Sequence, residues 1–343
     1  DVTAAHPWPS NRPSPPLLDV RELSVSFVLG GTALSAVSGV DFHLALGETL
    51  CLLGESGAGK TVTMRALIRL LPPTAQIAGQ IVLDGIDVMG LDANGLQAVR
   101  GAKVSMIFQD PLTAMDPVFT IGSQIAETVV CHDGLSYSAA RVRALELLDL
   151  VQIPSARRRL DAYPHELSGG LRQRAMIALA LSCRPKLLLA DEPTTALDAT
   201  VQIQILLLLR ELQRELGMAT IFVTHDLGVA CEVADRVAVM YAGRFVETGT
   251  ITEVIDSPRH PYTIGLLGST VHAGTDNGPL TPIPGAPPDL SDMPPGCAFA
   301  PRCPRVVRAC TERIPELAEF EPGRQARCPR ITEEAHTTLG RKM

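Results

Sequence analysis

Residues 54–61 have the composition of a loop that wraps a polyphosphate. They read Gly-Glu-Ser-Gly-Ala-Gly-Lys-Thr and follow a short apolar run, 48–53. Glycines let successive backbone amides approach a phosphate chain, and a helix that follows adds its positive end. Lys60 would reach the β- and γ-phosphates, and the Thr61 hydroxyl would bind Mg²⁺. The predicted nucleotide-binding residues of this P-loop are Gly54, Glu55, Ser56, Gly57, Ala58, Gly59, Lys60 and Thr61.

Two carboxylates follow an apolar stretch farther along the chain. The run 187–190 is Leu-Leu-Leu-Ala, and Asp191 and Glu192 come directly after it. A P-loop needs an acid at the end of a neighbouring strand for its metal ion, and a group that takes the proton of the attacking water. We assign Asp191 to the Mg²⁺ shell and Glu192 to the general base. An apolar run before two acids is a weak signal alone, and the upstream P-loop gives it weight.

A third motif lies between these two features. Residues 167–174 read Leu-Ser-Gly-Gly-Leu-Arg-Gln-Arg. A serine before two glycines can leave amides and a hydroxyl free for an anion at a helix start, although a simple helix cap fits Ser168 equally well. The octet resembles the LSGGQ signature of the nucleotide-binding subunits of ABC transporters, with Leu171 in place of glutamine. The resemblance implies that Ser168, Gly169 and Gly170 contact ATP.

The resemblance covers residues 18–256 and implies roles for further residues. Gln109 matches the glutamine loop, which contacts Mg²⁺ and water, and His225 matches the switch histidine at the γ-phosphate. The implied catalytic set is Glu192, His225, Lys60 and Gln109, with Thr61, Gln109 and Asp191 around Mg²⁺. Phe27 falls where the family has an aromatic residue stacked on adenine, although it could equally be a core residue at the end of an alternating strand.

The chain contains one P-loop and one signature, without an internal repeat. In the family it resembles, the signature of one cassette closes over the ATP held by the P-loop of another. One copy therefore cannot form a complete site, and a dimer of cassettes is implied. We expect the partner to be a second ABC ATPase subunit of a different, F-type kind.

The elements that position these motifs follow from apolar patterning. Strands are predicted at 18–27, 40–46, 48–53, 187–190 and 220–223, with a hairpin at 81–88. Helices are predicted at 60–71, within 120–160 and at 201–216. Strands alternating with helices indicate the α/β class with a parallel sheet. The resemblance refines this to a P-loop NTPase ABC cassette with a RecA-like core, an antiparallel β subdomain, a helical subdomain and a small Cys-rich C-terminal extension.

The composition of the sequence changes around residue 257, where proline and glycine become more frequent. The segment 257–267 contains His-Pro-Tyr-Thr and resembles the region after the cassette in oligopeptide and dipeptide importers, as do 283–288 and 296–304. The likeness is strongest to the D-type ATPase subunit. The predicted organisation is a flexible Pro-rich tail at 1–17, the nucleotide-binding domain at 18–256, a C-terminal region at 257–330 and a polar tail at 331–343.

Four of the eight cysteines, Cys297, Cys303, Cys310 and Cys328, gather in this C-terminal region. Disulfides do not suit a reducing cytoplasm, and the tight Cys pair typical of zinc sites is missing. Four thiolates meet the ligand count of an iron–sulfur cluster, and some of the importers that the region resembles carry [4Fe–4S] there. We expect such a cluster in a structural role, with zinc or unligated thiols as alternatives. The other four are expected to be small buried hydrophobes: Cys51, Cys131, Cys183 and Cys231.

Composition excludes several classes of protein. Thirty basic residues against 37 acidic ones give a formal charge of -7, which argues against a sequence-independent nucleic-acid binder. No apolar run approaches the roughly 20 residues of a membrane helix, and residues 1–17 lack the apolar core of a secretory signal.

The resemblance implies an ATP-hydrolysing subunit at the cytoplasmic face of the membrane, powering uptake of oligopeptides or dipeptides. Two separate permease subunits would form the path, and an extracytoplasmic solute-binding protein would deliver the solute. One alternative is the ATPase of a nickel or metal-chelate importer, because those proteins share the architecture. The other is a soluble ABC ATPase acting on ribosomes or DNA, which the acidic balance and the importer-type C-terminal region disfavour.

Overall fold

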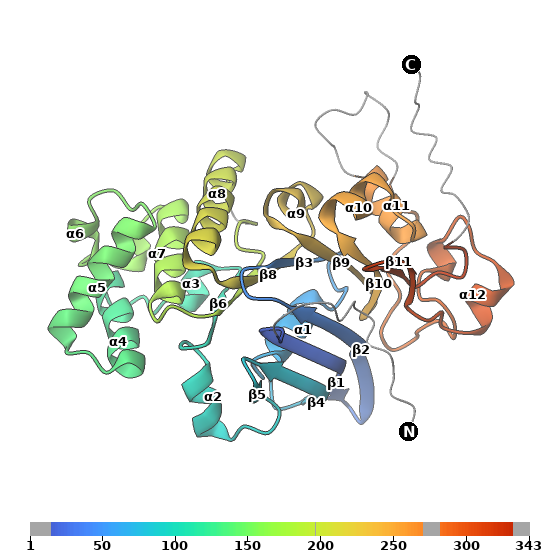
Figure 1. Cartoon of the computed structure of the whole chain (residues 1–343), viewed down its shortest axis with the longest axis horizontal. Coiled ribbons are helices and arrows are strands. Elements are labelled where there is room, and N and C mark those ends of the chain that lie inside the picture. Colours follow the sequence, from blue (N-terminus) through green and yellow to red (C-terminus); the bar gives the residue numbers. More distant parts are fainter. Residues whose placement is uncertain (1–14, 196, 270–281, 332–343) are drawn as a thin grey trace, which may run out of the picture.

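The structure is a computed structural model that describes residues 15–195, 197–269 and 282–331. The tails predicted at 1–17 and 331–343 lie almost entirely outside the described residues. Residues 15–17 of the first tail are described, and among them Leu17 is buried in the core. The described chain folds around two β-sheets, with helices on both sides of the larger one (Figure 1).

The larger sheet has the strand order β11-β12-β10-β9-β3-β8-β7-β6. From β9 to β6 all neighbours are parallel, whereas β10, β12 and β11 add on antiparallel at one edge. Strands β3, β7, β8 and β9 are buried along their whole length, which explains why their sequences are mainly apolar. The bounds are β3 Thr49–Leu53, β6 Val104–Ile107, β7 Leu187–Asp191, β8 Ala219–Thr224, β9 Arg236–Tyr241, β10 Arg244–Thr250, β11 Ala318–Glu321 and β12 Arg324–Ala326.

The smaller sheet is antiparallel, with the order β2-β1-β4-β5. It contains β1 (Leu18–Leu29), β2 (Thr32–Leu44), β4 (Ala75–Leu83) and β5 (Ile86–Asp87). The hairpin predicted around Asp84 and Gly85 is confirmed as the β4–β5 turn. The predicted strand at 40–46 covers only the end of β2, which begins at Thr32 and pairs with β1 along its length.

A group of helices forms a separate lobe beside β6 (Figure 1). Ile121, Leu147, Leu148 and Val151 pack together there with Ile177 in one apolar cluster. The helices of the lobe are α4 Ile121–Asp133, α5 Tyr137–Leu150, α6 Ala156–Arg159, η1 Pro164–Glu166 and α7 Gly169–Leu181. The other helices of the first 256 residues are α1 Lys60–Ala66, α2 Ala93–Val99, α3 Pro111–Ala114, α8 Ala199–Leu216, α9 Leu227–Val233 and α10 Ile251–Asp256. The predicted α/β cassette, with antiparallel and helical parts, is confirmed.

The helix after the P-loop ends at Ala66, so the prediction of a helix up to Leu71 is wrong. Arg69 adopts a left-handed conformation, with φ 52°, which a regular helix does not tolerate. The guanidinium of Arg100 donates to the carbonyls of Ile68 and Arg69, 2.9 Å from each. A distant side chain therefore satisfies the carbonyls that a longer helix would have bonded.

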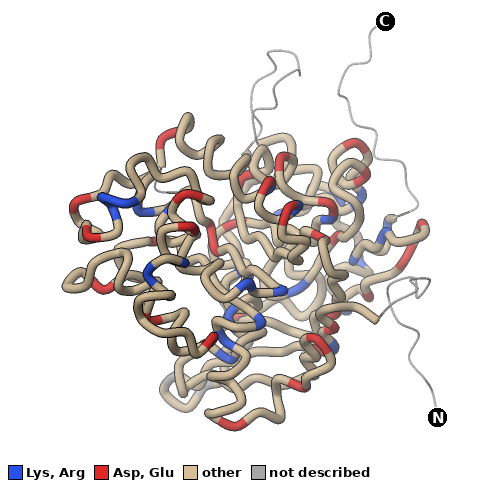
Figure 2. Tube along the Cα trace, turned by 60° about the vertical axis from the view of Figure 1, so that its left-hand side comes forward, with Lys and Arg blue, Asp and Glu red and all other residues tan. Residues whose placement is uncertain are grey.

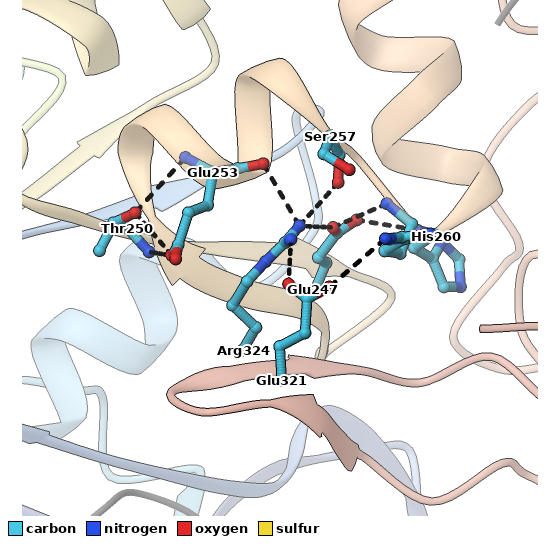
Figure 3. A network of polar contacts seen from close by, with 8 residues as sticks. Glu247, Thr250, Glu253, Ser257, His260, Glu321 and Arg324 are labelled. Atoms are coloured by element: carbon cyan, nitrogen blue, oxygen red, sulfur yellow. Dashed lines mark hydrogen bonds and ion pairs between the residues drawn. The ribbon is translucent and has the colours of Figure 1, made fainter. Parts of the chain in front are cut away.

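The C-terminal region joins the larger sheet, because β12 pairs with β10. Figure 3 shows a network of hydrogen bonds and ion pairs that stabilises the contact between β10 and the C-terminal region. Glu247 of β10 is fully buried and accepts the backbone N–H of Arg259 and of His260, each at 2.8 Å. Arg324 of β12 reaches the carboxylate of Glu247 at 3.9 Å and donates to the Ser257 carbonyl at 2.6 Å. The remaining elements here are α11 Pro261–Gly268, η2 Ala300–Arg302 and α12 Arg308–Glu312.

Basic and acidic residues are interspersed over the described trace (Figure 2). Within the described ranges, none of the helices combines the length and apolar character needed to cross a bilayer.

Candidate nucleotide-binding site

The P-loop connects β3 to α1, as the sequence predicts. Gly59 has φ 102°, and a Cβ there would lie 2.7 Å from the Ala36 carbonyl oxygen. Gly54 has φ 159°, and a Cβ there would collide with the Met240 carbonyl oxygen. Glycine is therefore required at both ends of the loop by the packing of β2 and β9 around it.

Lys60 is the first residue of α1 and is 5% exposed. Its Nζ donates to the carbonyl oxygens of Gly54, at 2.7 Å, and Glu55, at 2.9 Å. Burial lowers the pKa of Lys60, and the carboxylates of Glu192 and Asp191 oppose that shift. The ammonium group thus lies inside the P-loop and binds two of its backbone carbonyls. The carboxylates of Glu192 and Asp191 are close enough to stabilise its charge.

Thr61 and Asp191 lie in direct contact. The Thr61 hydroxyl donates to Asp191 Oδ1 at 2.7 Å, and Arg65 reaches Oδ2 at 3.4 Å. Asp191 is 1% exposed, and burial raises its pKa. A hydroxyl and a carboxylate side by side form an oxygen donor pair of the kind that Mg²⁺ binds.

Glu192 contacts three side chains, two of which come from the carboxyl ends of the neighbouring strands β6 and β8. Its carboxylate accepts from Gln109 Nε2 at 3.3 Å and from Thr195 Oγ1 at 3.1 Å, and it lies 3.2 Å from His225 Nδ1. Gln109 follows β6, Glu192 follows β7 and His225 follows β8. Because these strands are parallel and adjacent, their ends meet at one edge of the sheet, and the sequence-predicted trio is brought together there.

The signature motif lies elsewhere. Ser168 is the N-cap of α7, and its side chain makes no capping hydrogen bond. Gly170 packs closely on α8, since a Cβ there would lie 2.7 Å from Val201 Cγ1. Helix α7 belongs to the helical lobe and is well separated from α1 in Figure 1. The structure therefore does not bring Ser168, Gly169 and Gly170 to the P-loop of their own chain.

Phe27 lies near the end of β1, half-buried, and packs against the core beneath the smaller sheet. It pairs with Ala75 of β4. The residue is thus on a strand of the antiparallel sheet, as predicted.

The four C-terminal cysteines approach one another. Cys310 and Cys328 are buried, Cys297 and Cys303 are half-buried, and the Cys297 amide donates to the Cys310 carbonyl at 2.7 Å. Burial raises the pKa of Cys297, Cys303 and Cys328, and neighbouring thiols of the same four raise each further. Across the described ranges, however, no group of three or more His, Cys, Asp or Glu side chains has the arrangement of a metal site.

The prediction for the other four cysteines is partly wrong. Cys51 is buried, whereas Cys131 and Cys231 are exposed and Cys183 is half-buried. Cys131 and Cys231 lie on helices α4 and α9, where helical periodicity turns some positions of an apolar stretch toward solvent.

Four residues at the site are ones that sequence reasoning missed. Arg65 and Thr195 contact the two acids, and Tyr262 and Arg302 contact Glu55 from the C-terminal region. Arg65, on α1 one turn beyond Thr61, could have been found from helical spacing. Nothing in the sequence signals the other contacts, which depend on how distant segments pack.

A P-loop between a buried parallel strand and a helix, with an acid pair at the end of another parallel strand of the same sheet and a second sheet of antiparallel strands, defines the class of P-loop nucleotide-binding cassettes. The sequence pattern of the ABC transporter family matches residues 37–195. The pattern of the oligopeptide/dipeptide transporter C-terminal region matches residues 246–310.

Relatives and solved structures agree with this class. The chain is 50% identical to the oligopeptide transport ATP-binding protein OppD of Bacillus subtilis (strain 168), over 88% of this chain and 85% of that protein. It is 49% identical to the dipeptide transport ATP-binding protein DppD of the same organism, over 87% and 90%. A dimeric, post-hydrolysis ATP-binding cassette bound to ADP and Pi is 29% identical with a TM-score of 0.61, covering 68% of this chain and 98% of that one.

The chain belongs to the ATP-binding subunits of ABC transporters, within their oligopeptide and dipeptide transport branch. The resemblance stated from its motifs is confirmed, as is its class as an ABC ATPase.

Proposed function

We propose that this protein hydrolyses ATP to power import of oligopeptides or dipeptides through separate membrane subunits. The observation that carries the proposal is the pairing of a complete P-loop site with a C-terminal region that matches oligopeptide/dipeptide transporters. The close relatives named as oligopeptide and dipeptide transport proteins support peptides as the solute. A nickel or metal-chelate solute is the second candidate, because its importers share the architecture.

Within this proposal, the P-loop residues hold the phosphates, and Lys60 exchanges its two carbonyl partners for phosphate oxygens. Thr61 and Asp191 would hold Mg²⁺ together with Gln109, and the bound ion would neutralise charge on the β- and γ-phosphates. Glu192 orients the attacking water and takes its proton, and His225 contacts the γ-phosphate. Phe27 would stack on adenine.

We infer the assembly from the site. Ser168, Gly169 and Gly170 serve the ATP of a partner cassette, and a different, F-type ATPase subunit is that partner. The pair docks on two permease subunits at the cytoplasmic face of the membrane, and an extracytoplasmic solute-binding protein delivers the solute. Nucleic acid is not a partner, because the chain carries a formal charge of -7.

The test is ATPase activity of the purified assembly in proteoliposomes, with the solute-binding protein present. We expect dipeptides or short oligopeptides to stimulate hydrolysis severalfold and nickel chelates to have no effect. The same assembly carrying Glu192→Gln is the control for contaminating ATPase. Stimulation by nickel chelate alone would favour the second candidate, and copurification with ribosomes instead of permeases would contradict both.

We further propose that Cys297, Cys303, Cys310 and Cys328 bind a structural [4Fe–4S] cluster, with zinc as the alternative. The support is the gathering of four buried or half-buried thiols in the C-terminal region, where the Cys297 amide donates to the Cys310 carbonyl at 2.7 Å. Anaerobically purified protein should contain about four iron and four sulfide per chain, and Cys310→Ser should lose most of both. Cys231→Ser, at an exposed thiol, is the matched control. Colourless protein without iron would contradict the iron–sulfur cluster. One zinc ion per chain in that protein would support the zinc alternative instead.

A further inference from the structure

An arginine of the C-terminal region makes a two-point ion pair with the P-loop. Arg302 donates from one guanidinium nitrogen to Glu55 Oε2 at 2.7 Å and from the other to Oε1 at 3.1 Å. Glu55 is the second residue of the P-loop, and 247 positions separate it from Arg302. Paired, parallel hydrogen bonds of this kind are stronger and more directional than a single surface ion pair.

Arg302 is held rigidly for this contact. It is 7% exposed, its Nε donates to the Pro284 carbonyl at 2.9 Å, and its guanidinium lies 5.8 Å from the centre of the Tyr241 ring and 5.9 Å from that of Phe299. The hydrogen bonds to Glu55 are the main cause that raises the pKa of Arg302. The side chain is thus built into an aromatic pocket and directed at a single acid.

The backbone of Glu55 is held from the same side. Its amide donates to the Tyr262 hydroxyl at 2.9 Å, and Tyr262 is fully buried. The Glu55 carbonyl in turn accepts from Lys60 Nζ. One P-loop residue therefore connects the C-terminal region, through its amide and carboxylate, to the catalytic lysine.

Electrostatics explains what this arrangement does. Glu55 is a negative charge within a loop that binds a highly negative polyphosphate, and like charges repel. Arg302 neutralises that charge and fixes the carboxylate against the C-terminal region. Without Arg302, the carboxylate would be unpaired and free to move along the loop.

We propose that Arg302 is a positioning residue for ATP binding: it holds and neutralises Glu55 so that the P-loop accepts the phosphates. The proposal rests on ATP binding by the P-loop and adds a role for the C-terminal region in it. Because Arg302 directly precedes Cys303, whatever binds the cysteines also acts on the turn η2 that carries the arginine.

The test compares ATP binding and steady-state ATPase activity of full-length variants in the complete assembly. Arg302→Gln should weaken ATP binding and raise the KM for ATP by about tenfold, the loss expected for a charge-assisted bidentate contact, with kcat at saturating ATP within about twofold. Arg302→Lys, which keeps the charge without the fork, should fall between wild type and Arg302→Gln. Arg308→Gln changes an exposed arginine on α12 and is the matched control.

The decisive variant is the double change Arg302→Gln with Glu55→Gln. If repulsion by the unpaired carboxylate causes the defect, removing that charge should restore most of the ATP affinity, whereas a merely structural role of Arg302 predicts no recovery. An unchanged KM in Arg302→Gln, or equal KM values in the single and double variants, would overturn the proposal. If Arg302→Gln does not fold, Arg302→Lys with and without Glu55→Gln gives the same comparison. Wild-type protein that binds no ATP would instead contradict the proposed function.

Discussion

At the scale of the residue, Glu192 shows how the fold prepares one side chain. It adopts φ 45°, a conformation that non-glycine residues rarely take. Its amide donates to the Val223 carbonyl of β8 at 3.0 Å, and its carboxylate contacts Gln109, Thr195 and His225. The strain is maintained because contacts on several sides fix both the backbone and the carboxylate, which is typical of functional positions.

Glu192→Gln tests the assigned base. We expect hydrolysis to fall by about 10²- to 10⁴-fold, because an amide cannot accept the proton of the attacking water. ATP affinity should change little, since glutamine preserves the shape of the side chain, and ATP should hold the cassettes together as a dimer. Phosphate release and size-exclusion chromatography with ATP measure the two effects.

The control for this variant is Glu211→Gln, at an exposed position of α8. It should hydrolyse ATP at the wild-type rate. Undiminished turnover in Glu192→Gln would remove that residue from the catalytic role.

At the scale of the element, α11 is anchored by buried polar groups. His260 is its N-cap, 1% exposed, and its Nδ1 accepts from the Tyr262 amide at 3.1 Å. The fully buried carboxylate of Glu247 accepts the two amides that precede the helix, and burial raises its pKa. The position of α11 decides where the Tyr262 hydroxyl meets the P-loop, so these anchors connect the C-terminal region to the site.

The stability of this anchor should depend on pH through His260. Burial lowers its pKa from 6.5 to about 3, so between these values the unfolded chain binds a proton that the folded chain does not. The stabilisation that neutral, buried His260 contributes to the free energy of unfolding is therefore complete above pH 6.5. It is lost as the pH falls, by about 2 kcal/mol at pH 5. Denaturant unfolding at pH 8 and pH 5 should show this loss in wild type and a smaller loss in His260→Asn, which keeps a capping acceptor.

His165→Asn, at an exposed histidine, should keep the wild-type pH dependence of unfolding. The same loss between pH 8 and pH 5 in His260→Asn as in wild type would mean that another group is responsible.

At the scale of the whole molecule, the P-loop and the signature are on separate parts of one chain. Helix α7 lies in the lobe beyond α8, away from α1 (Figure 1). Ser168 leaves its hydroxyl unused in capping, which suits a contact made with another cassette.

Ser168→Glu tests whether the signature acts on the ATP of a partner cassette or on the ATP of its own P-loop. A carboxylate at this position would repel the ATP of the partner cassette, so hydrolysis in the assembly should fall by about tenfold or more. ATP binding by the isolated chain should be unchanged, because Ser168 is remote from its own P-loop. Ser138→Glu, at an exposed position early in α5, controls for the added charge. Equal loss of ATP binding by the isolated Ser168→Glu chain would place the signature at its own site.

Much of the fold and site follows from local patterns. The buried strands β3, β7 and β8 lie where apolar runs predict them, because strands covered on both faces need apolar residues throughout. The β9–β10 pair and the strands β11 and β12 were not predicted. The short strands β11 and β12 gain their stability by pairing at a sheet edge, which no local pattern reveals.

The sequence by itself determined the chemistry of the nucleotide site, since glycine spacing, a lysine, a hydroxyl and two acids are local requirements of phosphate and Mg²⁺ binding. Only the tertiary structure decided that the C-terminal region reaches back to that site. The contacts of Arg302 and Tyr262 with Glu55 join segments more than 200 residues apart. Such contacts arise from the way α11 and η2 pack beside β9, and packing between distant segments leaves no periodic trace in the chain.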